Sequence, residues 1–172
     1  MRTFTLKLAI ATGLLCVASF AQAQTTFNIT GNITAGTCTI AVNSGNPLNV
    51  GTFNANLFTG SYQSGFVAPI NISYSNCAAG MQSITFKFTG TADKTTGGNA
   101  NFWDSGLPGA PFELRDTNAS GAVLPPSGAT PIQINNPGTS GTHPITAQFH
   151  QTGALSKTGA GTATVTLGVT YQ

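Results

Sequence analysis

The side chains best suited to acid–base chemistry are few in this chain of 172 residues. Among the four carboxylates, only Glu113 and Asp116 are near neighbours, in the stretch PFELRD. If that stretch is a strand, the two side chains point to opposite faces, which does not suit paired acid–base catalysis. No serine lies in a nucleophile-elbow motif. We therefore predict that the protein is not an enzyme.

The two histidines offer no better site. His143 and His150 are an odd number of residues apart, so a continuous strand would also place them on opposite faces. They lack a clear third ligand for zinc. We expect neither a metal nor a cofactor, and we interpret both histidines as structural residues at the surface.

Residues 1–23 have the pattern of a secretory signal peptide. The segment has a basic start with Arg2 and Lys7, an apolar stretch over 8–20 and an A-x-A cleavage site at 21–23. The apolar stretch is too short to span a membrane. We expect an exported chain that begins at Gln24 after cleavage.

Cleavage leaves two of the three cysteines, Cys38 and Cys77. In an exported chain without metal-ligand spacing, two cysteines most simply form one disulfide. On the loop-entropy model, a bond over this separation contributes about 4 kcal/mol to stability.

The charges that remain after cleavage are few and balanced. Four carboxylates oppose four cations, which are Lys87, Lys94, Arg115 and Lys157. This composition provides no basic surface for nucleic acid or for anionic lipid. The low charge and the 40% hydrophobic content are also the opposite of a disordered composition.

Short apolar runs with a period of two follow one another along the chain, separated by Gly, Pro and Asn. The runs are TCTIAV, FVAPINISYSNC, SITFKF, PFELRD, PIQIN, PITAQF and the final ATVTLGVTY. No long stretch has a helical period. Many short strands with turn signals between them predict an all-β sandwich, in a chain long enough for one domain with a sizeable core.

Several features resemble, in combination, a subunit of chaperone–usher pili, close in layout to the tip adaptors and rod subunits of type 1 pili. Cys38 lies seven residues after Gly31, which is the one glycine of a short alternating arm, and Cys77 closes the strand INISYSNC. FTGTAD follows after about ten residues, and the last strand has Gly159 fourteenth from the end and Tyr171 as its penultimate residue. The resemblance covers residues 24–172.

The resemblance implies an incomplete immunoglobulin-like sandwich that lacks its last strand. Its final strand would border an open groove that a periplasmic chaperone fills first and the arm of the next subunit fills later, by strand addition at an outer-membrane usher. The groove-border and chaperone-binding residues would be Gly159, Ala163, Val165, Leu167, Val169, Tyr171 and Gln172.

The implied domain division is an N-terminal donor-strand arm at 24–36 and a pilin domain at 37–172. The arm residues that would enter a neighbour's groove are Phe27, Ile29, Gly31, Ile33 and Ala35. Burial of the three large side chains is worth about 6 kcal/mol. The short arm is more typical of a tip adaptor than of a rod subunit, and the position in the pilus stays open. The implied function is that of a structural subunit of an adhesive surface pilus (fimbria), which contributes to cell adhesion.

A self-contained secreted β-sandwich, such as a carbohydrate-binding module, is the alternative. In that case FNITGNI would be the domain's own first strand, and the last strand would close an ordinary sandwich. A sugar site would need a stacking aromatic, for which Trp103 is the sole tryptophan candidate. Its position beside Phe102 in a Gly-rich loop is more typical of a partly buried loop anchor.

Overall fold

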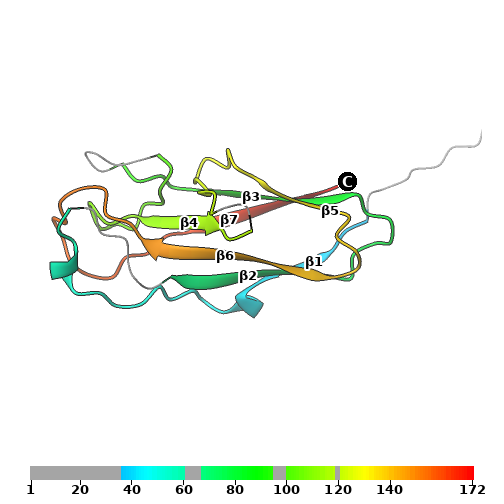
Figure 1. The fold of residues 1–172 in the computed structure, drawn as a ribbon, viewed down its shortest axis with the longest axis horizontal. Helices are drawn as coiled ribbons and strands as arrows, with labels where there is room; N and C mark the ends of the chain where they lie inside the picture. Colours follow the sequence, from blue (N-terminus) through cyan, green and yellow to red (C-terminus); the bar gives the residue numbers. More distant parts are fainter. Residues whose placement is uncertain (1–35, 61–66, 95–99, 119–120) are drawn as a thin grey trace, which may run out of the picture. The chain divides into compact units, whose positions relative to one another are not determined.

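A computed structural model describes residues 36–60, 67–94, 100–118 and 121–172 (Figure 1). The predicted signal peptide, 1–23, and the arm residues 24–35 lie outside this part. The described strands are β1 (Thr39–Val42), β2 (Ala68–Ser75), β3 (Ser83–Gly90), β4 (Phe112–Asp116), β5 (Ile132–Asn135), β6 (Gly141–Phe149) and β7 (Val165–Tyr171). Two short 3-10 helices, η1 (Asn43–Gly45) and η2 (Ala55–Leu57), lie between β1 and β2.

The strands form two antiparallel sheets, ordered β1-β2-β6-β4 and β5-β3-β7 (Figure 1). A constant-type immunoglobulin sandwich has sheets ABED and CFG. Here β1, β2, β6 and β4 take the places of A, B, E and D, while β3 and β7 take those of C and F. No described strand occupies the place of G beside β7. The fold of the described residues is therefore an immunoglobulin-like sandwich without its last strand, as predicted.

Alternating side chains build the core between the two sheets. In β2, Ile70, Ile72 and Tyr74 are buried and their neighbours are more exposed, which is the pattern of a strand with one face on a core. Pro69 lies near the start of β2, before the part of the strand that pairs with β1, so one side of β2 is unpaired there. The buried residues of β3, β4 and β6 complete the core and include Ile84, Phe86, Phe88, Leu114, Ile145 and Ala147.

The Cys38–Cys77 disulfide links the residue before β1 to a residue just after β2. This is the pairing predicted from the sequence. Because β1 and β2 are also hydrogen-bonded in register from Thr39 to Val42, the covalent link fixes the end of an already paired strand.

Candidate strand-acceptor groove

The final strand, β7, has one free edge in the described part of the chain. It pairs with β3 from Val165 to Tyr171 and with no other described strand. Its alternate side chains Leu167, Val169 and Tyr171 are only half-buried, and Val165 is 39% exposed. Side chains of a completed central strand would be as buried as Phe86 of β3. The strand that the sequence predicts as half-buried therefore lies at the border of an unfinished core.

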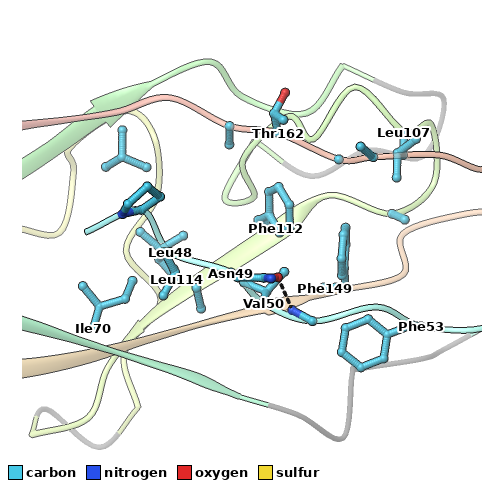
Figure 2. A pocket seen from close by; sticks show the side chains of 18 of the residues that line it. Leu48, Asn49, Val50, Phe53, Ile70, Leu107, Phe112, Leu114, Phe149 and Thr162 are labelled. Atoms are coloured by element: carbon cyan, nitrogen blue, oxygen red, sulfur yellow. Dashed lines mark hydrogen bonds between the residues drawn. The ribbon is translucent and has the colours of Figure 1, made fainter. Parts of the chain in front are cut away.

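A groove of about 900 Å³ opens beside this strand (Figure 2). Its floor is the inner face of the opposite sheet, with Ile70, Ile72, Phe112, Leu114, Ile145, Ala147 and Phe149. One rim consists of residues 157–163 with Val165 and Leu167, and the other consists of Val42, residues 46–53, Ala55 and Phe58. Val42, Leu48 and Val165 on the two rims are among the large hydrophobic side chains that remain exposed. Apolar exposure gathered in one groove is typical of a binding surface.

The groove lining is nearly uncharged. Lys157 is the only charged residue among the described residues that line it. The described lining offers mostly apolar side chains, together with the edge of β7. Such a surface suits an extended, uncharged segment that pairs with β7 and inserts alternate apolar side chains.

The two ends of the groove region differ. At one end, Phe149 contacts the rings of Phe112, Phe53 and Phe58, with centroid distances of 4.5, 5.9 and 6.2 Å. We call these four rings the aromatic end. The last residues of β7 lie beyond the cavity lining, where the Tyr171 hydroxyl donates a hydrogen bond to the carbonyl oxygen of Cys38 at 3.2 Å.

The structure places the residues predicted for the last strand in three settings. Val165 and Leu167 belong to β7 and line the groove. Gly159 and Ala163 also line it but precede β7, because the strand begins at Val165 rather than at Ala163. Val169 and Tyr171 pack against the core beyond the lining.

The terminal residue, Gln172, is held by backbone contacts. Its N–H donates to Ser83 O, and its carbonyl oxygen accepts from the N–H groups of Gln82 and Ser83.

The predicted arm residues lie outside the described residues. The rim opposite β7, with Leu48, Val50 and Phe53, was not predicted as part of the groove, because its apolar residues are unevenly spaced among turn residues.

The fimbrial protein family matches residues 27–172. The chain belongs to this family. It is 24% identical over 99 residues to the S-fimbrial protein subunit SfaG of Escherichia coli O6:K15:H31 (strain 536 / UPEC), an alignment that covers 57% of each chain. The chain thus spans just over half the length of this curated relative. As a fimbrial protein, it is a structural component of a surface pilus.

Solved structures agree with the family on the fold. The P pilus rod subunit PapA superposes with a TM-score of 0.63 at 19% identity, over 78% of this chain and 99% of PapA. A chain from a chaperone–usher pilus structure that concerns rod uncoiling superposes with a TM-score of 0.61 at 17% identity, over 88% of this chain and 97% of that chain. These likenesses show the shared sandwich fold.

The carboxylates of Glu113 and Asp116 in this fimbrial protein make hydrogen bonds or ion pairs within the fold. Glu113 is buried on the outer face of β4, where it accepts hydrogen bonds from Arg115 Nη2 at 2.6 Å and Gln148 Nε2 at 2.7 Å. Burial alone would raise the pKa of Glu113, but these hydrogen bonds and the charges of Arg115 and His150 hold the pKa below its ordinary value. Asp116 lies on the opposite face of β4 with Leu114, so the two carboxylates cannot act as a pair.

The surface interpretation of the histidines was wrong for His143. This side chain is buried, and its Nε2 lies 2.8 Å from Asp116 Oδ1. His150 is partly buried and contacts Glu113 Oε2 at 3.2 Å.

The described residues contain no group of three or more His, Cys, Asp or Glu side chains placed to hold a metal. Within the same residues, no helix has the length and apolar character needed to cross a membrane.

Trp103 is fully buried, with 0% exposure, rather than partly buried as expected. Its Nε1–H donates to the carbonyl oxygen of Leu124 at 2.9 Å, so its polar atom is satisfied inside the core. A buried indole cannot stack on a sugar. The carbohydrate-binding alternative therefore loses its tryptophan candidate.

Proposed function

We propose that this pilus subunit is assembled by donor-strand exchange and contributes to an adhesive surface pilus. The observation that carries the proposal is an edge of β7 that pairs with no described strand and lies beside an apolar groove, in the position of strand G. An inserted strand would bond to the β7 backbone and bury alternate side chains on the groove floor. An uncovered edge and groove of this kind would otherwise promote aggregation.

The proposed occupant is the N-terminal arm of a neighbouring subunit. Residues 24–36 of this chain have the composition such an arm needs, with Phe27, Ile29 and Ile33 on one face and no charge. At about 3.3 Å per residue, this segment is longer than the seven residues of β7 that it would accompany. Gly31 at its centre fits a close approach to the groove floor.

The remaining partners follow from the family. We propose that a periplasmic chaperone covers the groove after the signal peptide is removed, and that an outer-membrane usher is the site of exchange. The disulfide is compatible with this route, because disulfides form in the oxidising periplasm. The groove border then includes Val165 and Leu167, with Val169, Tyr171 and Gln172 as further contacts of the chaperone.

Purification of the exported chain alone tests the proposal. The chain should self-associate, and an excess of a synthetic peptide of residues 24–36 should keep it monomeric in size-exclusion chromatography. A peptide of the same composition in shuffled order is the control and should not have this effect. A chain that stays monomeric and stable without any peptide would instead be a self-contained sandwich.

A further inference from the structure

The groove rim opposite β7 lies between η1 and η2 outside any assigned strand, and its burial does not follow the alternation of a strand. Val50 and Phe53 are both half-buried against the core, whereas Leu48, Gly51 and Thr52 are exposed. In an extended strand the side chain on the same face as Val50 would be that of Thr52, because side chains alternate. The rim therefore contains a shift of one residue between Val50 and Phe53.

A turn between Asn49 and Gly51 accounts for this shift. The side-chain oxygen of Asn49 accepts a hydrogen bond from the Gly51 N–H at 2.8 Å, the interaction of an Asx turn (Figure 2). Gly51 has a φ of 98°, in a region that glycine adopts readily and other residues do not.

The shift brings Phe53 into the aromatic end. Its ring meets Phe149 edge to face at 5.9 Å, and Figure 2 shows the two rings beside one another. With regular alternation, Thr52 would face the core in place of Phe53. This end of the groove would then be wider and would lack one aromatic wall.

We infer that Asn49 and Gly51 are positioning residues that make the aromatic end selective for one bulky apolar side chain of the inserting strand. The inference rests on the proposed strand exchange. Asn49 and Gly51 act through Phe53, which supplies the contact. The occupant is the arm of a second copy of this chain, because residues 24–36 are uncharged, as the groove lining is apart from Lys157.

Peptide binding to the full exported chain tests the inference. The probes are dye-labelled peptides of residues 24–36, unsubstituted or with Phe27→Ala, Ile29→Ala or Ile33→Ala, and binding is measured by fluorescence anisotropy. With the wild-type chain, each substitution should weaken binding by about 30-fold, the ratio that corresponds to about 2 kcal/mol of lost burial. With the Asn49→Ala chain, one of the three peptide substitutions should no longer weaken binding, and the other two should weaken it as before. Gly51→Ala should remove the same binding penalty.

Asn54→Ala is the matched control. Asn54 Oδ1 accepts a hydrogen bond from Asn56 N–H at 3.0 Å, so it makes the same kind of turn a few residues away, and its side chain does not line the groove. This variant should keep all three penalties. Asn49→Asp retains the acceptor oxygen and should restore the wild-type pattern. In a Phe53→Ala background, Asn49→Ala should have no further effect on peptide binding, because both changes remove the Phe53 ring from the aromatic end.

The outcomes separate the inference from the proposed function. If Asn49→Ala keeps all three penalties or lowers all three equally, the positioning role is wrong while strand exchange stands. If no peptide binds the wild-type chain, both the strand exchange and the inference are overturned.

Discussion

The hydroxyl of Tyr171 donates a hydrogen bond to the backbone carbonyl oxygen of Cys38 over 3.2 Å. Tyr171 ends β7 of one sheet, and Cys38 immediately precedes β1 of the other sheet. Cys38 is in turn bonded to Cys77 after β2. The penultimate residue of the chain is thereby linked, through one hydrogen bond and one covalent bond, to the opposite half of the sandwich.

Tyr171→Phe removes this hydrogen bond and keeps the ring. We expect the free energy of unfolding to fall by about 1 kcal/mol, the usual net worth of such a bond. Tyr171→Ala should cost more, because the packing of the ring is lost as well. Urea unfolding of the three proteins measures the difference. Equal stability of wild type and Tyr171→Phe would show that the contact does not hold the strand end.

Loss of the disulfide should have a larger effect. The bond closes a loop with a sequence separation of 39, so the double variant Cys38→Ser/Cys77→Ser should lose about 4 kcal/mol of stability. An incomplete sandwich has little stability in reserve, so the periplasmic yield should fall as well. Thiol labelling of the unfolded wild-type chain without reductant provides the check. Two reactive thiols in natively exported protein would contradict the pairing.

The lowered pKa of Glu113 predicts a pH dependence of stability. Since the folded-state pKa lies below 4.5, the ionised carboxylate contributes stability above about that pH, and the contribution is lost as the pH falls through the folded-state pKa. The stability difference between wild type and Glu113→Gln should therefore shrink as the pH is lowered from above 4.5 through the lower folded-state pKa of Glu113. Urea unfolding across this range measures it. A difference that stays constant would mean that the ionised form gains nothing from Arg115 and Gln148.

Local patterns were sufficient to predict most of the fold. A period of two in β2, β3 and β7 is read from neighbouring residues, and the resemblance indicated that β7 borders a groove. The burial of His143 could not be predicted in this way, because its contact with Asp116 depends on how β4 pairs with β6. The rim at Val50 and Phe53 was missed for a related reason. The one-residue shift between Val50 and Phe53 depends on the φ of Gly51. Phe149, whose ring Phe53 contacts, is remote in sequence.

Leu167→Asp places a charge at the edge of the groove. Burying an unpaired carboxylate against the inserted strand is costly, so co-purification with the periplasmic chaperone should fall sharply. Thr166→Asp is the matched control, because Thr166 is the adjacent residue of β7, is exposed and points to the other face. Chaperone co-purification should be close to that of wild type for Thr166→Asp. Equal recovery of both variants would argue against β7 as the groove border.

Substitution of Gly31 can separate the role of the N-terminal arm from the folding of the pilin domain. If Gly31 passes close to a neighbour's groove floor, Gly31→Leu should overfill the groove, at a cost of commonly ~1–3 kcal/mol. Asn32→Ala, one residue along and pointing outward, should be much milder. The measurement is displacement of chaperone from a partner subunit by synthetic peptides of residues 24–36, unsubstituted and with each change. Equal displacement by the three peptides would mean that the arm does not insert in this register. In the full-length chain, Gly31→Leu should fold and bind chaperone normally, whereas a folding defect there would indicate that FNITGNI is this domain's own first strand.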